Sequence, residues 1–409
     1  MRWRRLHRGR PMSDPNHATQ NVFDGTVQFP VLILRQDALT NNLAEMRGFC
    51  ADNDVTLAPH CKTHLSPELW RMQQEWGAEI ATVATVAQAA ALFEHGVRRI
   101  LIANEVVDRA GLRAMSDMRR EDPGFQISML VDSIEAVTLI ERILEEVAAD
   151  LPPLPVLVEL GARGLRSGAR TLEEVIEVAT AASATRVLDL VGVEGYEGVF
   201  GKLSGAERDR AIDAYLDSGV VAVRELIDRG LVEAPAIATF GGSRFYPAVV
   251  ERVRGALSPS EATVILRSGC YLTHDHGTYA ASHADVPSRV GKPRLSPGME
   301  VWGVVLSLPE PGLAIAGVGK RDVSYDEGMP VPLAIRRDDV VSELTGVSVT
   351  RLNDQHAFIR VSPDSVPLRI GDLIAFGISH PCTTFDKWRT AYIVDEDYSV
   401  ESVAHTLFH

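Results

Sequence analysis

Short apolar runs alternate with amphipathic stretches along the first 285 residues. The runs that predict strands are 56–60, 80–84, 99–103, 126–131, 155–160, 187–193, 236–240 and 263–266. Helical spacing of apolar residues predicts helices between them, over 66–76, 86–95, 107–120, 133–148, 172–182, 206–229 and 246–257. Strands alternating with helices predict parallel βαβ units, and eight units predict a closed (β/α)8 barrel. An open doubly wound sheet is the alternative, although no GxGxxG opens the first unit.

The pattern changes near residue 286, where prolines and glycines become frequent. Short β-rich runs follow at 300–306, 313–317, 346–350, 357–361, 372–376 and 390–394. Turn residues between such runs predict a mainly antiparallel β domain over 286–409. We therefore expect a disordered N-terminus at 1–22 and a barrel domain over 23–285. The apolar run near 22–36 either adds a strand to the β domain or leads into the barrel.

Composition limits the function classes. The chain has 409 residues, 45% of them hydrophobic, and a formal net charge of −14, which argues against nucleic acid and anionic membranes as partners. It has no apolar run of about eighteen residues that could span a bilayer. The four cysteines are scattered and form no CxxC pair, which favours a reducing compartment. We expect a soluble, cytoplasmic protein.

The most informative stretch is Leu57-Ala58-Pro59-His60-Cys61-Lys62-Thr63-His64, at the end of the first barrel strand. Residues two apart in a strand point to the same face, so His60, Lys62 and His64 are expected to project together. A lysine shielded from water can lose its proton and form a Schiff base with an aldehyde cofactor. The alternative is a solvated surface lysine beside two histidines.

Several further candidates lie at the carboxyl ends of predicted strands, where barrel enzymes carry their chemistry. Arg166 lies in the glycine-rich stretch 161–168, where it could meet an anion or a ring nitrogen, and Tyr196 could stack or merely pack. The loops after the last two strands hold the remaining candidates, which are Gly241, Gly242, Ser243, Gly269, Cys270 and Tyr271. Such loops often bind phosphate through free backbone N–H groups. A lysine-reactive aldehyde that carries a phosphate is pyridoxal 5'-phosphate (PLP).

A His-x-Cys pair, His380 and Cys382, lies in the predicted β domain. Imidazole and thiolate are ligands that zinc prefers, and two protein ligands would leave positions open for substrate. The alternative is a core cysteine that happens to lie near a histidine. His356, in a polar cluster upstream, is expected to be a substrate or outer contact rather than a ligand.

Several motifs together resemble one known family. They are the stretch 58–63, Ala84-Thr85-Val86-Ala87-Gln88, Leu101-Ile102-Ala103-Asn104, Gly241-Gly242-Ser243, Arg267-Ser268-Gly269-Cys270-Tyr271 and His380-Pro381-Cys382. They resemble the D-threonine aldolase / D-serine dehydratase family, fold-type III PLP enzymes related to alanine racemase. The residues of these motifs are most similar to the amino acid deaminase (D-serine deaminase-like) branch. The similarity extends from about residue 28 to residue 405.

The resemblance implies a Schiff base on Lys62 and a divalent metal on His380 and Cys382, with zinc expected and manganese as the alternative. It also implies a homodimer with sites between the barrel of one chain and the β domain of the other. Two positions depart from the family pattern, since Ala58 stands where many members have arginine and Leu65 where many have lysine. Aldolases of the family tend to have aspartate at the second metal position, so Cys382 favours a dehydratase.

The predicted function is metal-assisted lyase chemistry on a D-amino acid with a 3-hydroxyl group. Lys62, close to His60, would remove the Cα proton, and loss of water would give a 2-oxo acid and ammonia. Retro-aldol cleavage to glycine and an aldehyde is the first alternative. A racemase, which would need a second base opposite Lys62, and a non-catalytic PLP-binding protein are the others. The sequence leaves the identity of the D-amino acid open.

Overall fold

The computed structural model describes residues 21–285 and 288–408. Most of the predicted disordered segment, residues 1–20, lies outside this part of the chain. The prediction of disorder is wrong for its last two residues. Asn21 forms an isolated β-bridge with Ser399, and Val22 is fully buried, with its N–H donated to the carbonyl of Tyr398.

Eight parallel strands form the first sheet, in the order β2-β9-β8-β7-β6-β5-β4-β3. They are β2 (Thr56–Leu57), β3 (Ala81–Val83), β4 (Arg99–Glu105), β5 (Gln126–Val131), β6 (Leu154–Leu160), β7 (Leu188–Gly195), β8 (Ala236–Phe240) and β9 (Ala262–Leu266). An isolated parallel bridge between His60 and Thr82 joins the segment after β2 to β3, so the sheet curls until its two ends meet. The predicted parallel barrel is confirmed, and an open doubly wound sheet is excluded.

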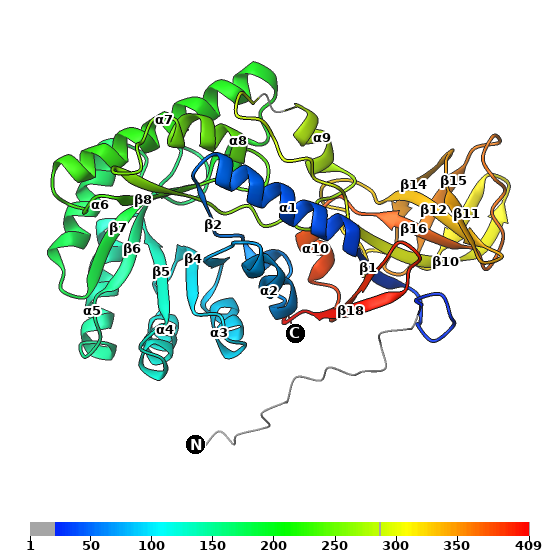
Figure 1. Ribbon diagram of the computed structural model, residues 1–409, viewed down its shortest axis with the longest axis horizontal. Coiled ribbons are helices and arrows are strands. Elements are labelled where there is room, and N and C mark those ends of the chain that lie inside the picture. Colours follow the sequence, from blue (N-terminus) through cyan, green and yellow to red (C-terminus); the bar gives the residue numbers. More distant parts are fainter. Residues whose placement is uncertain (1–20, 286–287, 409) are drawn as a thin grey trace.

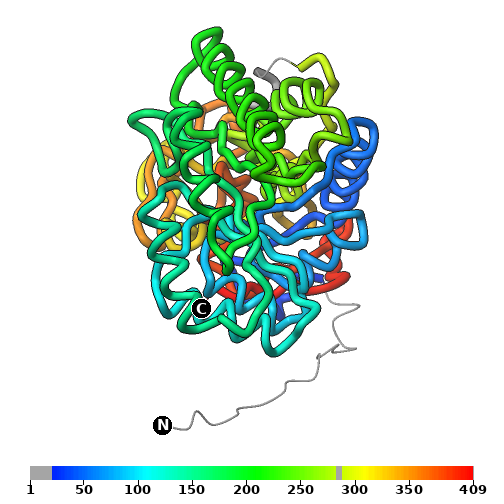
Figure 2. The backbone as a smooth tube through the Cα atoms, turned by 90° about the vertical axis from the view of Figure 1, so that its left-hand side faces the viewer, coloured from blue at the N-terminus to red at the C-terminus, as the bar shows by residue number. Residues whose placement is uncertain are grey.

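Helices cover the outside of this sheet (Figures 1 and 2). They are α1 (Gln36–Asp52), α2 (Pro67–Glu75), α3 (Val86–Glu94), α4 (Arg109–Glu121), α5 (Ile134–Val147), α6 (Leu172–Ala184), α7 (Gly205–Asp228) and α8 (Tyr246–Val249), which continues as a π-helical segment, Val250–Arg254. Short polar residues cap the helix starts: the side chains of Ser66, Thr85 and Asp108 accept N–H groups of α2, α3 and α4. Each such cap contributes about 1 kcal/mol. These caps fix where each strand-to-helix loop ends.

Both faces of the barrel strands are buried. Along β4, Ile100 and Ile102 belong to the main hydrophobic core, whereas Leu101 belongs to a separate small cluster with Leu130 and Leu157. Successive side chains of a strand point to opposite faces, so this second cluster fills the barrel interior. The continuous apolar runs seen in the sequence follow from this two-sided burial.

A second, ten-stranded sheet contains the C-terminal part of the chain, with the main order β13-β12-β16-β10-β1-β17-β18. Its strands are β1 (Val31–Arg35), β10 (Met299–Glu310), β11 (Leu313–Ala316), β12 (Val331–Arg337), β13 (Val340–Glu343), β14 (Val347–Leu352), β15 (Ala357–Val361), β16 (Leu373–Gly377), β17 (Thr390–Val394) and β18 (Val400–His405). The predicted mainly antiparallel β domain is confirmed, while its boundary near residue 286 stays a prediction. Two short helices, α9 (Thr278–Asp285) and α10 (Pro381–Phe385), and two 3-10 turns, Cys61–Thr63 and Glu197–Phe200, complete the described elements.

The N-terminal strand settles the question left open for the run near 22–36. β1 pairs antiparallel with β10 and parallel with β17, in the middle of the C-terminal sheet. In Figure 1 the blue strand β1 accordingly lies in the same sheet as the red strand β18, with β17 between them. The chain thus begins in the second sheet, crosses to build the barrel, and returns. None of the described helices is long and apolar enough to cross a membrane.

Candidate active site

A cavity of about 610 Å³ opens at the carboxyl ends of the barrel strands and is closed on one side by α10. Most of the residues predicted from the sequence line it: His60, Lys62, Arg166, Tyr196, Gly241, Gly242, Ser243, Cys270, His380 and Cys382. The structure therefore brings together side chains from six separate stretches of the chain. Two predicted residues are absent from the lining. Gly269 packs against the carbonyl of His60, and Tyr271 is buried in the core.

Lys62 lies in a 3-10 turn, Cys61–Thr63, rather than on a strand. Its side chain is solvent-accessible and lines the cavity together with Gly241, Gly242 and Ser243. The prediction that His64 projects beside it is wrong, because the turn ends the two-residue alternation. His64 is buried instead, and its Nε2 lies 3.1 Å from Oε1 of Gln73.

His60 contributes a buried ring nitrogen to the site. Its Nδ1 has no hydrogen-bond partner among the described residues. Burial first, and then the positive charges of Lys62, Arg267 and Arg166, lower the pKa of His60 well below its usual value. The imidazole is therefore neutral at physiological pH and adds no positive charge to the site.

The backbone N–H groups of the glycine loops are not free, contrary to the prediction. The buried carboxylate of Glu197 accepts the N–H groups of Gly241 and Gly242, both at 2.9 Å. Ser243 Oγ accepts the N–H groups of Gly269 and Cys270, at 3.1 and 2.9 Å. These bonds fix both loops before any ligand binds.

Ser243 is the residue of these loops that could still bind an anion. Within the described part of the chain its own N–H makes no hydrogen bond, and its hydroxyl, which lines the cavity, also contacts the side chain of Cys270. An unsatisfied backbone donor beside a hydroxyl, at the edge of a cavity, suits a phosphate oxygen.

Arg267 and Glu194 form a buried ion pair that the sequence reading did not assign to the site. Both line the cavity, and the guanidinium contacts Oε1 of Glu194, the hydroxyl of Thr239 at 2.7 Å and the carbonyl of Gly195 at 2.9 Å. Burial raises the pKa of Glu194 to about 7, although Arg267 opposes the shift. A glutamate inside the apolar run of β7 was the sequence feature that could have revealed this pair.

Arg166 and Tyr196 lie on the neighbouring wall. The Arg166 guanidinium is 5.1 Å from the centre of the Tyr196 ring and donates to Oε1 of Glu159 at 3.0 Å. The Tyr196 ring lies between two glycines, since a Cβ on Gly198 or Gly242 would come within 2.2 and 2.5 Å of it. Glycine at these positions is therefore what allows the ring to face the cavity.

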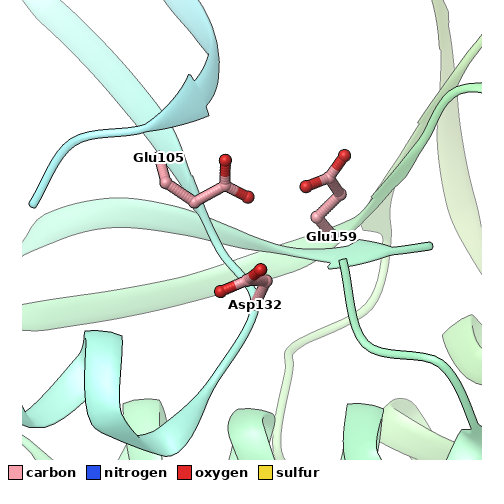
Figure 3. A group of neighbouring side chains, drawn as sticks. All are labelled: Glu105, Asp132 and Glu159. Carbon is pink, nitrogen blue, oxygen red and sulfur yellow. The ribbon is translucent and has the colours of Figure 1, made fainter. Parts of the chain in front are cut away.

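Behind Arg166, three carboxylates point toward one another: Glu105, Asp132 and Glu159, with ligand atoms all within 4.8 Å (Figure 3). Glu159 is paired with Arg166, and Asp132 accepts the N–H of Gly168 at 3.2 Å. Burial and the neighbouring Glu159 raise the pKa of Glu105, which holds a proton that the two glutamates can share. A shared proton accounts for Glu105 Oε1 and Glu159 Oε2, which otherwise have no partner.

The His-x-Cys pair faces Lys62 from α10. Nδ1 of His380 lies 2.6 Å from Oδ2 of Asp326, whose other oxygen accepts the Thr383 hydroxyl at 2.9 Å. A carboxylate on Nδ1 fixes the tautomer whose Nε2 carries the lone pair, the arrangement common for metal-bound histidines. Cys382 Sγ lies 3.3 Å from the hydroxyl of Thr63. These residues therefore fit a divalent metal.

Both halves of this site come from one chain. Thr63 follows Lys62 in the barrel, and Cys382 belongs to the C-terminal part of the chain. The implied arrangement, with the β domain of a neighbouring chain facing each barrel, is wrong for His380 and Cys382. His356 also departs from its expected role, because it is exposed in the turn between β14 and β15 and is absent from the lining.

Comparisons with known proteins agree with this architecture. The family model for the alanine racemase N-terminal domain matches residues 34–229, and the model described as "Putative serine dehydratase domain" matches residues 298–394. A 3-hydroxy-D-aspartate aldolase of Paracoccus denitrificans (strain Pd 1222) is 25% identical over 391 residues, which cover 94% of this chain and 93% of that protein.

Two solved structures share the fold over nearly their whole length. D-threonine aldolase from Filomicrobium marinum has a TM-score of 0.77 and 24% identity, covering 93% of this chain and 95% of its own. D-threo-3-hydroxyaspartate dehydratase from Delftia sp. HT23 has a TM-score of 0.75 and 20% identity, covering 94% of this chain and 98% of its own. The fold predicted from the sequence is therefore shared with these proteins.

Proposed function

Because this chain belongs to the D-threonine aldolase / D-serine dehydratase family of alanine racemase-like PLP enzymes, we propose that its cavity binds a D-amino acid with a 3-hydroxyl group. The chain is a PLP-dependent lyase, and the proposal concerns its substrate, its site residues and its reaction. The observation that supports it most is the shared cavity of Lys62, His380 and Cys382. An amine that can bind an aldehyde thus faces two metal ligands across a space of substrate size.

The residues present fit PLP. Lys62 would bind the cofactor aldehyde, and Ser243 would meet the phosphate through its backbone N–H, beside its hydroxyl. Arg166 and Tyr196 line the side wall, and the Arg267–Glu194 pair offers a buried charge network for the ring. Bound PLP supplies an electron sink for negative charge at the substrate Cα.

The residues also fit a divalent cation. His380, oriented by Asp326, and Cys382 would hold the ion on the side of the cavity that faces Lys62. Such an ion supplies a Lewis acid for the 3-hydroxyl group. We therefore keep zinc as the expected metal, with manganese as the alternative.

The chain's own residues perform the proton transfers. Lys62 Nζ removes the proton from the substrate Cα. Neutral His60 adds no positive charge beside Lys62. The buried carboxylate of Glu197 keeps the loop at Gly241 and Gly242 fixed, so Ser243 is held in position for the anion.

The proposed outcome is dehydration to a 2-oxo acid and ammonia, because a cysteine stands at the second metal position. Retro-aldol cleavage to glycine and an aldehyde is the second candidate, favoured by the similarity to a 3-hydroxy-D-aspartate aldolase. Racemisation is the third candidate: it would need a second base opposite Lys62, where the cavity lining places the proposed metal ligands His380 and Cys382 and also Tyr279. We also keep a homodimer as a prediction.

One experiment separates the two outcomes. Purified enzyme loaded with PLP and zinc is incubated with D-serine, D-threonine and D-3-hydroxyaspartate, and with their L-isomers. We expect 2-oxo acid and ammonia from at least one D-substrate and none from its L-isomer. Aldehyde and glycine instead would establish the aldolase. No turnover of any D-substrate would overturn the proposed function.

A further inference from the structure

Two cysteine sulfurs meet beside the proposed metal position. Cys270 Sγ, in the loop after β9, lies 3.5 Å from Cys382 Sγ on α10, although the two residues are 112 positions apart. Both side chains line the cavity, and the Thr63 hydroxyl lies 3.3 Å from Cys382 Sγ and 3.7 Å from Cys270 Sγ. The fold therefore brings two thiols together on this wall of the cavity, and the hydroxyl groups of Thr63, Ser243 and Tyr279 surround Cys270.

The distance between the sulfurs matches what one zinc ion requires. Zinc–sulfur bonds are about 2.3 Å long, and a tetrahedral angle then places two bound sulfurs about 3.8 Å apart. The observed separation of 3.5 Å differs from this by a few tenths of an ångström. A small outward movement of either side chain would let both sulfurs bind the same ion.

We propose that Cys270 is a third protein ligand, so that a zinc ion is held by Cys270, Cys382 and His380. This inference rests on the proposed function for the presence of a metal and goes beyond it in the ligand set. Three protein ligands with one open position are the pattern of catalytic zinc sites, and two cysteines with one histidine are among the known sets. The open position would face Lys62 and receive the substrate hydroxyl.

The third ligand requires a movement of His380. Among the described residues, His380, Cys270 and Cys382 do not have their ligand atoms all within 4.8 Å of one another. Since the two sulfurs are close together, the His380 ring nitrogens are too far from at least one of them. The ring lies at the start of α10, next to the half-exposed Asp326 that orients it. Binding of the ion therefore draws the imidazole toward a thiol pair that is already assembled.

The ligand set also determines the metal and its charge. Two thiolates balance the double positive charge of the ion, whereas one thiolate would leave the site with a net positive charge. Thiolates select zinc over manganese, which prefers carboxylate, carbonyl and water oxygens. Cys270 therefore decides between the two metals that the ligands His380 and Cys382 leave open.

X-ray absorption at the zinc edge tests the assignment directly. The full-length protein is treated with a chelator under reducing conditions and reloaded with one equivalent of zinc. We expect two sulfurs at about 2.3 Å and lighter ligands at about 2.0–2.1 Å. Cys270→Ser and Cys270→Ala should each retain one sulfur and lower the zinc affinity by about 100-fold, measured by competition with a chromophoric chelator.

Cys50→Ala is the matched control, because Cys50 is a buried thiol that does not line the cavity, and it should keep both sulfurs. Circular dichroism confirms that each variant is folded. A single sulfur in the wild-type spectrum, or an unchanged sulfur count in both Cys270 variants, would overturn the proposal. Zinc bound by two sulfurs in a protein that turns over no D-substrate would refute the proposed function and leave this site intact.

Discussion

The imidazole Nδ1 of His380 and the carboxylate Oδ2 of Asp326 lie 2.6 Å apart. This contact fixes the ring so that its other nitrogen is free to bind a cation. Removal of the carboxylate would leave the proposed ligand His380 in place but would let its ring rotate and exchange its tautomer. Outer contacts of this kind commonly affect metal affinity by about 10–100-fold.

Asp326→Ala should therefore lower the zinc affinity about 10–100-fold without unfolding the protein. Chelator competition gives the affinity, and a thermal melt shows that the fold is retained. Asp338→Asn is a suitable control, since Asp338 is exposed in the turn between β12 and β13. Equal affinities for Asp326→Ala and the wild type would show that the carboxylate does not orient the ligand.

Lys62→Ala should abolish both turnover and the visible absorbance of lysine-bound cofactor, because the variant has no amine to react with the aldehyde. Absorbance spectra after reconstitution with PLP and gel filtration provide the measurement. Lys320→Ala removes an exposed lysine in the loop between β11 and β12 and should keep the visible absorbance of the bound cofactor. A coloured Lys62→Ala protein would place the cofactor on another residue.

Gly242→Ala should displace the Tyr196 ring, since the new Cβ would lie 2.5 Å from Cε2 of that ring. We expect the affinity for PLP to fall about tenfold, equivalent to about 1.4 kcal/mol. Gly48→Ala in α1 is the contrasting change, because nothing lies within 4 Å of its added Cβ. That helix substitution should raise the free energy of unfolding by about 1 kcal/mol. Unchanged PLP binding in Gly242→Ala would mean that the ring plays no part.

Arg267→Met should lower the free energy of unfolding by about 3–5 kcal/mol, because Glu194 would remain buried without its partner. Arg229→Met removes an exposed pair with Glu225 one helical turn away and should cost about 0.5 kcal/mol or less. Denaturant unfolding measures both changes. A loss of the same small size for the two variants would show that the buried pair contributes little.

The carboxylate cluster predicts a pH dependence of stability. Burial and Glu159 raise the pKa of Glu105 from 4.5 to about 9, so the folded state binds this proton more tightly than the unfolded chain. The stability contribution is complete below pH 4.5 and is lost as pH rises toward 9.

In Glu105→Gln the free energy of unfolding should fall less steeply with rising pH than in the wild type. We expect the slope to differ by about 0.5 kcal/mol per pH unit, a value reduced to allow for the partial exposure of Glu105. Denaturant unfolding at several pH values gives the slope. Glu173→Gln, at an exposed position in the first turn of α6, should leave it unchanged. Parallel pH profiles for Glu105→Gln and the wild type would contradict the shared proton.

The sequence predicted the barrel well because its strands are buried on both faces and its helices start at short polar caps. β5 (Gln126–Val131) and β8 (Ala236–Phe240) have the predicted bounds. The hairpin of β12 and β13 was missed, since Pro332 weakens the first strand pattern and all four residues of β13 are exposed. A strand without a buried face has no alternation to detect.

The cavity lining was predictable where it depends on position at a strand end, as for Lys62 and Ser243. It was not predictable where function depends on contacts between distant segments. Neither the pairing of Arg267 with Glu194 nor the contact of Cys270 with Cys382 is visible in local spacing. His64 was predicted to project beside Lys62, but the 3-10 turn at Cys61–Thr63 changes the direction of the side chain that follows it.

The position of β1 between β10 and β17 limits how the protein can be divided. A fragment that starts at residue 286 would lack an inner strand, and its two neighbours would expose unpaired edges prone to aggregation. The two lobes are also joined by two separate covalent crossings, one after Arg35 and one before Met299. If the cavity opens, both connections must therefore bend together. The lobes can then rotate only about the axis that passes through the two connections.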